Sequence, residues 1–318
     1  MSAIIITGCA GFIGSHLCEQ LLKEGYTVKG IDNFDNYYDT EYKKRNLASF
    51  IHHKNFKFYN IDVRSPQLEK VIENGDIIVH LAARPGVRRS NRKPITYIEN
   101  NIVGTIALLE AARKKDAQQI VFGSTSSVYG LAETPFKEYA AADRPLSIYA
   151  ATKRSSEIML YVYSYYYDLP TTILRFFTVY GPRVRPDMAI YKFAKNILEE
   201  KPITVYGEGK LKRDYTYVSD TVDGIIKALK KKFSYEIFNI GSGRPVEIIR
   251  IVRLLEQNLN KKAKIIFKEK PKEDVPVTYA DITKARNLLG YQPKIPLETG
   301  VKAFVQWFLN HRKHQTPG

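Results

Sequence analysis

The chain has 318 residues, with 49 Lys+Arg against 33 Asp+Glu and a formal net charge of +16 at pH 7. This length is enough for one large or two small domains with a full core. No apolar run reaches the length of a membrane span and no basic-then-apolar signal peptide precedes the first predicted strand, so we expect neither a membrane protein nor a secreted one.

The basic charge and the cysteines limit the possible partners. The basic residues are scattered in short groups typical of solvated helix ends and loops, so we expect no nucleic-acid partner; a small substrate with several negative charges fits the net charge as well. Cys9 and Cys18 cannot form a tetrahedral zinc site alone, and the six His lack an HxxxH spacing, so we predict no metal. These features predict reduced thiols in a cytoplasmic protein.

The chain begins with a pattern typical of nucleotide binding. Residues 3–7 form a short β-branched run that predicts a buried parallel strand, and a helical pattern follows at residues 12–23. Between them stand Gly8, Gly11 and Gly14. A glycine-rich turn between strand and helix lets backbone N–H groups approach a pyrophosphate at the helix N-terminus. The alternative is a strand, turn and helix without any ligand, which this order of elements disfavours.

A second predicted strand, at residues 26–31, indicates which dinucleotide is bound. It ends in Asp32, about 20 residues beyond the glycines, where an acid that binds the adenosine ribose is expected. Asn33 follows. The carboxylate of Asp32 would repel the 2′-phosphate of NADP, so the pattern predicts NAD as the cofactor.

Further strands are predicted along the first half of the chain, and they alternate with helical patterns. This alternation is typical of an α/β fold with a doubly wound parallel sheet, Rossmann-like in kind. Asp62 follows one of these strands, where its carboxylate can accept from an adenine amino group or simply cap the strand end. The additional strands lie near residues 56–61, 76–81, 119–124 and 171–177.

Tyr149 and Lys153 are candidates for the chemistry. They are four residues apart, so on a helix both side chains share one face. Ser147 is a predicted N-cap for that helix. An ammonium beside a phenol favours the phenolate and lowers the phenol pKa, which makes Tyr149 a candidate general base and acid. The hydroxyl of Thr125 is expected to share the substrate hydroxyl that Tyr149 deprotonates.

The pattern loosens after Gly181, where prolines and glycines punctuate short elements. We therefore predict an NAD-binding domain at residues 1–178 and a smaller α/β substrate-binding lobe formed mainly by residues 179–318. Helical patterns return at 220–231, 246–259 and 297–309. Some of these later segments are expected to return to the first domain.

Taken together, these motifs resemble the extended short-chain dehydrogenase/reductase family. The glycine spacing is Gly-x-x-Gly-x-x-Gly, it is combined with Tyr-x-x-x-Lys, and the resemblance runs through nearly the whole chain. It implies tightly bound NAD and a catalytic set of Tyr149, Lys153 and Thr125. The cofactor-binding positions that it implies are Gly8, Gly11, Phe12, Ile13, Gly14, Asp32, Asn33, Asp62, Val63, Leu81, Ala82, Ala83, Asn101, Tyr149 and Lys153.

Within this family, the residues after Thr125 indicate the reaction. Dehydratases and decarboxylases commonly have acids there, whereas this chain has Ser126 and Ser127, which cannot act as acids near neutral pH. The resemblance therefore implies a nucleotide-sugar 4-epimerase that works through a transient 4-ketone. Arg213 matches a family position that grips the diphosphate, Tyr206 an aromatic near the uracil ring, and Asp274 a ribose-hydroxyl acceptor. Glu273 departs from the usual glycine before that acid.

The segment at residues 176–189 is similar to the matching part of UDP-glucuronate 4-epimerases, and residues 85–88 agree. The substrate expected from this is UDP-glucuronate, converted to UDP-galacturonate. Its carboxylate requires charge-assisted donors, which Arg185 and the hydroxyls of Ser126, Ser127 and Thr178 can supply; Arg88 belongs to the similar segment and is assigned to the substrate too. The alternatives are a UDP-glucose 4-epimerase, a UDP-glucuronate decarboxylase, a non-catalytic NAD-binding regulator and a nucleic-acid-associated protein.

The predicted helix at residues 148–167 carries more aromatic side chains than one buried stripe holds, so its outer face is a candidate oligomer surface. In the family, the helix with Tyr149 and the helix with Asn101 commonly pair across a dimer. The resemblance therefore implies a homodimer.

Overall fold

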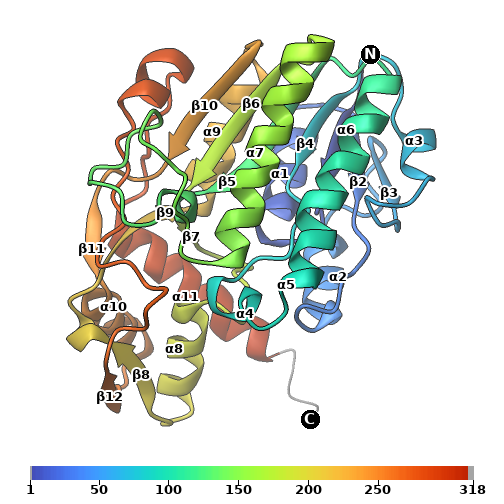
Figure 1. Ribbon diagram of the computed structural model, residues 1–318. Coiled ribbons are helices and arrows are strands. Elements are labelled where there is room, and N and C mark those ends of the chain that lie inside the picture. Colours follow the sequence, from blue (N-terminus) through green and yellow to red (C-terminus); the bar gives the residue numbers. More distant parts are fainter. Residues whose placement is uncertain (1, 314–318) are drawn as a thin grey trace.

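A seven-stranded parallel sheet organises the chain (Figure 1), which is described for residues 2–313 by a computed structural model. The strand order is β10-β6-β5-β4-β1-β2-β3, and every neighbouring pair is parallel. These strands are short and rich in buried branched residues, as a sheet covered on both faces requires. Their bounds are β1 Ile4–Thr7, β2 Val28–Ile31, β3 Phe56–Tyr59, β4 Ile77–His80, β5 Gln119–Thr125, β6 Thr171–Phe176 and β10 Tyr235–Ile240.

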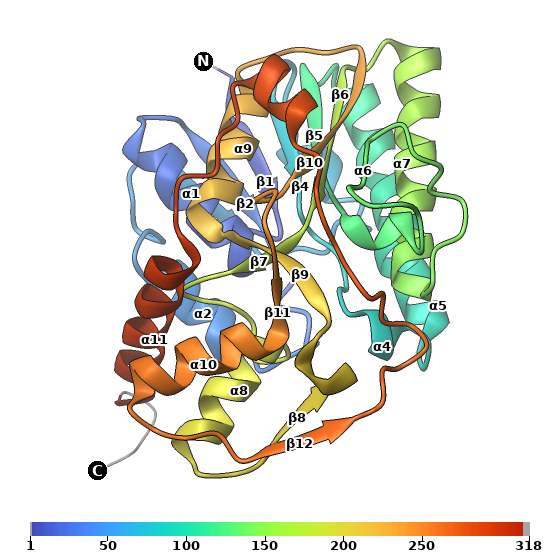
Figure 2. The same cartoon turned by 90° about the vertical axis from the view of Figure 1, so that its left-hand side faces the viewer.

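Helices cover both faces of this sheet (Figures 1 and 2). Alternation along β1 shows the two layers: Ile4 and Ile6 join the apolar cluster that includes α1, α2 and α9, whereas Ile5 joins the cluster that includes α3, α6 and α7. The helices of the first layer are α1 Phe12–Lys23, α2 Thr40–Ala48 and α9 Val218–Leu229. Those of the second are α3 Leu68–Val71, α6 Gly104–Lys114 and α7 Ile148–Tyr167, with a π-helix at Ile98–Val103 leading into α6.

A smaller α/β lobe lies beyond the carboxyl ends of the central strands, in the lower part of Figure 1. It contains a three-stranded sheet of order β11-β9-β7 and a parallel pair β12-β8. Its elements are β7 Thr178–Tyr180, α8 Ala189–Leu198, β8 Ile203–Tyr206, β9 Lys212–Tyr217, β11 Pro245–Glu247, α10 Ile248–Leu259, β12 Ile265–Lys268 and α11 Leu297–Lys313. Short helices complete the fold at α4 Val87–Ser90, α5 Pro94–Tyr97, Ser126–Tyr129, Gly207–Gly209 and Ala285–Leu289.

The predicted fold class is confirmed, and so are the six predicted strands of the central sheet. The helix predicted around Tyr149 is confirmed as α7, and the predicted N-cap Ser147 accepts from the backbone N–H of Ala150 at 3.2 Å. The sequence did not predict β10. This strand follows α9 and pairs in register with β6, so residues 235–240 extend the central sheet after the smaller lobe has begun.

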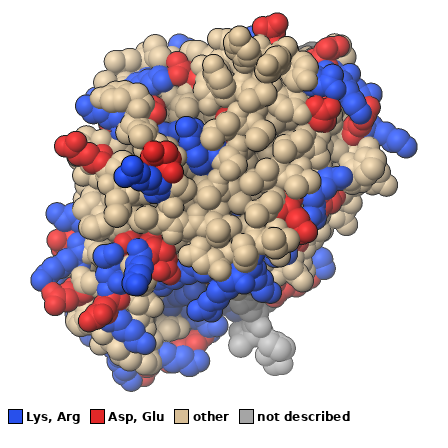
Figure 3. Space-filling model, in the orientation of Figure 1, with Lys and Arg blue, Asp and Glu red and all other residues tan. Residues whose placement is uncertain are grey.

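The outer face of α6 and α7 is largely uncharged, as Figure 3 shows from the viewpoint of Figure 1. Several large apolar side chains are exposed on this side of the molecule, on α5, the π-helix and α7. On and near the π-helix these are Ile95, Ile98 and Val103, and on α7 they are Ile158, Tyr161, Val162, Tyr165, Tyr166 and Tyr167. A contiguous exposed apolar face of this kind is typical of a protein–protein contact.

Two negative findings apply to residues 2–313. None of the helices described there has the length and apolarity needed to cross a membrane. The same part of the chain holds no group of three or more His, Cys, Asp or Glu side chains placed to bind a metal ion.

Candidate active site

Two adjoining cavities lie at the carboxyl ends of the central strands, where ligands bind in open parallel sheets. One has a volume of about 200 Å³ and the other about 880 Å³. The smaller cavity is lined by the glycine turn and by the residues that follow β2, β3 and β4, and the larger by residues of both lobes. The two share Phe12, Ile13, Tyr37, Pro85, Ser124, Tyr149, Phe176 and Arg185.

The glycine turn is closed so tightly that side chains cannot be added to it. A Cβ on Gly14 would lie 2.2 Å from the carbonyl oxygen of Gly8, and a Cβ on Gly8, at φ +74°, would lie 2.9 Å from the backbone nitrogen of Ala82. Gly11 is the N-cap of α1 and brings no side chain to the helix start. The first N–H groups of α1 are therefore open to an anion, and this cradle fits the pyrophosphate of NAD.

Gly14→Ala is expected to open this turn. Overpacking costs about 1–3 kcal/mol in general, and the new methyl group meets backbone atoms that cannot rotate away. We expect a lower thermal midpoint and weaker NAD binding, measured by calorimetry. Gly224→Ala is the matched control, because Gly224 also lies in a helix and its new Cβ meets side chains rather than backbone, namely Ile240 at 3.0 Å and Tyr291 at 3.4 Å. Equal losses in both variants would contradict the argument.

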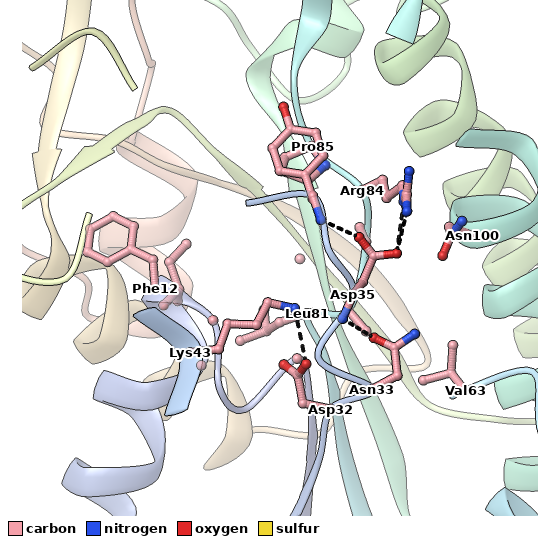
Figure 4. Close-up of a pocket in the computed structure, with 18 of the residues that line it drawn as sticks. Phe12, Asp32, Asn33, Asp35, Lys43, Val63, Leu81, Arg84, Pro85 and Asn100 are labelled. Carbon is pink, nitrogen blue, oxygen red and sulfur yellow. Dashed lines mark hydrogen bonds and ion pairs between the residues drawn. The ribbon is translucent and has the colours of Figure 1, made fainter. Parts of the chain in front are cut away.

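Asp32 is held in place by three donors at the end of β2, and Figure 4 shows one of them, Lys43. Its carboxylate accepts from the backbone N–H of Ala10 at 3.2 Å and of Phe34 at 2.9 Å, and it forms an ion pair of 3.2 Å with Lys43. Lys43 is buried and also lines the smaller cavity. Sequence reasoning missed Lys43, because it is brought to Asp32 by the packing of α2 and no local motif marks it.

Asn33 and Asp62 are brought together although they follow different strands. The Asn33 amide donates to Asp62 at 2.7 Å. Arg64 donates to both oxygens of the same carboxylate, and these hydrogen bonds lower the pKa of Asp62 to about 2. Asp62 is thus an ionised acceptor at the cavity wall, in the position predicted to face the adenine ring.

The loop after β2 is held at the smaller cavity by ion-pair and hydrogen-bond contacts with the segment after β4. Asp35 forms an ion pair with Arg84 at 2.6 Å, visible in Figure 4. Arg89 donates to the backbone oxygen of Tyr37 at 2.7 Å and lies over its ring. These cavity residues were not predicted either, since their approach depends on two loops that are about 50 residues apart in the chain.

Tyr149, Lys153 and Thr125 meet where the cavities join. Thr125 is near enough to Tyr149 to act on its pKa, and the ammonium of Lys153 lies 3.8 Å from the centroid of the Phe122 ring. The predicted lowering of the Tyr149 pKa by Lys153 is wrong for the protein alone. Burial raises the pKa of Tyr149, while the charge of Arg185 and the neighbouring Thr125 hydroxyl lower it only in part. Burial likewise lowers the pKa of Lys153 to about 7.

Arg185 stands beside this group and lines both cavities. Its guanidinium is oriented by Asp187, through Nε–Oδ1 at 2.9 Å and Nη2–Oδ2 at 3.2 Å. Ser126, Ser127 and Thr178 line the adjoining wall of the larger cavity. Together they form a wall of neutral hydroxyls with one cation, which suits a ligand carboxylate.

The far end of the larger cavity gathers the other predicted substrate residues. Arg88 forms an ion pair with Asp274 at 2.7 Å, and its guanidinium lies 4.4 Å from the centroid of the Tyr206 ring. Arg213 lines the same end and donates to the backbone oxygen of Lys212 at 2.8 Å. Burial lowers the pKa of Arg213, with Arg88 adding to the effect. Lys192 and Asn196 of α8 also line this cavity and were not predicted.

Asn101 is the predicted cofactor residue that does not line either cavity. Its amide binds the backbone of Arg84, accepting from the N–H at 2.8 Å and donating to the carbonyl at 3.1 Å, and it donates to Thr152 at 2.9 Å. It therefore joins the π-helix to the loop after β4 and to α7. The other fourteen predicted cofactor residues all line the smaller cavity, and the eight predicted substrate residues all line the larger one.

Comparisons with known proteins agree with this geometry. The model of the NAD dependent epimerase/dehydratase family matches residues 4–241. The chain is 45% identical over 311 residues to the UDP-glucuronate 4-epimerase of Thermodesulfobacterium geofontis, and the match covers 96% of each chain. It is 40% identical to the UDP-glucuronic acid 4-epimerase from Bacillus cereus solved with UDP-glucuronic acid and NAD, with a TM-score of 0.93 and coverage of 97% of this chain and 99% of that one. It is 32% identical to the UDP-glucose 4-epimerase of Thermotoga maritima solved with UDP-glucose, with a TM-score of 0.87 and coverage of 99% and 100%.

Proposed function

The chain belongs to the NAD dependent epimerase/dehydratase family, and from that membership we propose that it is an NAD-dependent epimerase that converts UDP-glucuronate to UDP-galacturonate. The observation that carries the choice of substrate is the position of Arg185 at the junction of the two cavities, beside Tyr149 and the hydroxyl-lined wall. A carboxylate at C6 of the sugar requires such donors next to the reacting C4.

Tyr149, Thr125 and Lys153 carry out the proton transfer at the 4-hydroxyl of the sugar. The Tyr149 oxygen takes the proton of the 4-hydroxyl, with Thr125 sharing that hydroxyl, and the cationic Lys153 stabilises the phenolate. When bound in the smaller cavity, NAD⁺ would supply the acceptor and then the donor of the C4 hydride. On return, Tyr149 gives its proton back to the 4-oxygen, which restores the hydroxyl with inverted configuration.

The sugar has to turn between the two halves of the reaction while its diphosphate stays fixed. The cavity volume of about 880 Å³ leaves room for this rotation. The guanidinium groups of Arg88 and Arg213 are suited to the diphosphate and its neighbourhood, with Tyr206 and Asp274 available to the uridine. The 4-keto acid formed in between is a β-keto acid that can lose carbon dioxide. Arg185 and neutral hydroxyls that hold the carboxylate ionised and oriented hinder that loss.

A UDP-glucose 4-epimerase is the second candidate, favoured by the similarity to the Thermotoga maritima enzyme. The test is incubation of the protein with UDP-glucuronate, UDP-glucose and UDP-xylose, with the products identified by NMR. We expect UDP-galacturonate from the first and little change in the others. Interconversion of UDP-glucose and UDP-galactose with UDP-glucuronate ignored would overturn the proposal, and a pentose product would identify a decarboxylase.

The proposal includes a homodimer formed by the exposed face of α6 and α7. Introducing a charge there is expected to give monomers, because burying an unpaired carboxylate in an interface is strongly unfavourable. Val162→Glu is the variant, since Val162 is exposed on α7, and Ile266→Glu on β12 is the control with a similarly exposed residue elsewhere. Light scattering coupled to size exclusion measures the mass. A wild-type monomer, or a dimer that survives Val162→Glu, would remove this interface.

Two further assignments belong to the proposal. One is a cytoplasmic location, supported by the two cysteines, which are both free thiols buried in the first domain. The other is the division into an NAD-binding part at residues 1–178 and a substrate lobe mainly at 179–318. The position of β10 in the central sheet supports the return of later segments to the first part.

A further inference from the structure

A fully buried carboxylate lies one helical turn beyond Lys153. Glu157 is 0% exposed and shares one face of α7 with Tyr149 and Lys153, since the three residues are spaced by four. Burying a carboxylate is costly unless it is paired. Its surroundings are therefore informative about what this charge does.

Glu157 joins three elements through its two carboxylate oxygens. Oε1 accepts from the Ser124 hydroxyl at 2.5 Å and from Nε of Arg175 at 3.0 Å. Oε2 accepts from Nη2 of Arg175 at 2.7 Å and from Nη1 of Arg154 at 3.0 Å. Ser124 belongs to β5 and lines both cavities, directly before Thr125. The carboxylate thus fixes α7 against β5 and β6 behind the reacting groups.

Arg175 is the main ion-pair partner of Glu157. This pair by itself does not explain why the Glu157 carboxylate lies beside Lys153. The Arg175 guanidinium is buried, forms a bidentate pair with Glu157 and lies 4.7 Å from the centroid of the Tyr129 ring. Lys153, in contrast, has the Phe122 ring at 3.8 Å, a cation–π contact that favours its charge only modestly, while its burial disfavours the charge. A cation in such a place requires an anion nearby to stay protonated.

We propose that Glu157 is a positioning residue for the catalytic pair: its carboxylate fixes α7 against Ser124 of β5 and keeps Lys153 in the cationic form that stabilises the Tyr149 phenolate. This inference deepens the proposed function and rests on it for the role of Tyr149. The charge of Glu157 opposes the effect of burial on the Lys153 ammonium. The charged and titratable groups around Lys153 and Glu157 are His80 of β4, Arg175 of β6, Tyr235 of β10, Tyr129 after β5, Arg185 ahead of α8, and Tyr149 and Arg154 of α7.

The charges of these neighbours decide in which direction each substitution shifts the titration midpoint of Lys153. His80 is buried and its pKa is lowered to about 3, so it stays neutral while Lys153 titrates. Removing the Glu157 charge leaves the cations Arg154 and Arg175 without their anion, and both then disfavour a charged Lys153. Removing Arg154 instead leaves Glu157 with less compensation, and this favours a charged Lys153. The two variants should therefore move the Lys153 titration in opposite directions.

The test follows the titration of Lys153 directly, so that it does not depend on turnover. Lysine labelled with ¹³C at Cε is incorporated, and the Lys153 signal is identified by its loss in Lys153→Met. We expect Glu157→Gln to lower the midpoint by roughly two pH units, the size expected for a unit charge one helical turn away at an effective dielectric constant of about 20. Arg154→Gln, in which a partly exposed side chain is changed, should raise it. Glu110→Gln is the matched control on α6, where the carboxylate accepts from Tyr163 of α7, and should leave the midpoint unchanged.

Activity provides the second readout. In Glu157→Gln, kcat on UDP-glucuronate should fall about tenfold with KM nearly unchanged, and the loss of kcat/KM with rising pH should begin at lower pH than in the wild type. If Glu157→Gln does not fold, Arg154→Gln alone tests the inference, because it is expected to raise the titration midpoint of Lys153. An unchanged Lys153 midpoint in the folded variants, or shifts of the same sign in both, would overturn the inference. A wild-type protein that turns over no UDP-sugar would overturn the proposed function alone, because the Lys153 titration would still be measured.

Discussion

Tyr149→Phe is expected to reduce turnover of UDP-glucuronate by at least about a thousandfold, within the range that general acid–base groups contribute. Phenylalanine fills the same space but cannot take the proton of the 4-hydroxyl. Because the glycine turn, Asp32 and Asp62 are untouched, NAD binding should remain close to the wild-type value. Steady-state kinetics and calorimetric titration with NAD measure the two quantities.

Two comparisons make this result specific. Thr125→Val should cause a smaller loss, since the proton acceptor remains, and Tyr97→Phe is the matched control. Tyr97 is a buried tyrosine whose hydroxyl donates to the backbone oxygen of Pro85 at 2.6 Å and lines neither cavity. Turnover of Tyr149→Phe within about tenfold of the wild type would remove Tyr149 from the catalytic role, and a parallel loss of NAD binding would indicate a structural effect.

Arg185→Ala is expected to lower kcat/KM for UDP-glucuronate by about 10- to 100-fold, which corresponds to the loss of one charge-assisted contact of about 1.5–3 kcal/mol. The same change removes a cation that lowers the pKa of Tyr149, so part of the loss will affect every substrate. The informative quantity is therefore the ratio of kcat/KM for UDP-glucuronate to that for UDP-glucose, which should fall. Release of a pentose product should rise, because the β-keto acid is no longer held.

Asp187 has to be controlled in this experiment. Without Arg185 its carboxylate loses two charge-assisted hydrogen bonds and repels the substrate carboxylate by itself. Adding Asp187→Asn to Arg185→Ala removes that repulsion, and Arg185→Lys retains the charge without the planar pair of donors. A specificity ratio that stays at the wild-type value in both Arg185→Ala and the double variant would show that Arg185 does not recognise the acid group.

The chain by itself determined the local parts of this protein. The β-branched runs specified six central strands and the spacing of four specified the shared face of Tyr149 and Lys153, because strand and helix periodicity depend only on neighbours in sequence. The glycine turn could also be predicted from the sequence. Position 14 accepts only glycine, because a Cβ there would lie 2.2 Å from the carbonyl oxygen of Gly8. The resemblance of the motifs then supplied the family and its cofactor.

Only the tertiary structure decided which side chains face one another across the chain. Arg88 pairs with Asp274 at a separation of 186 residues, and Lys43 reaches Asp32 through the packing of α2. β10 returns to the central sheet with no pattern strong enough to predict it. The signs of the pKa shifts at Tyr149 and Lys153 also follow from burial rather than from their spacing. The physical reason is common to all of these: burial and charge pairing between distant segments arise only when the packed elements bring them together, and no local pattern encodes that distance.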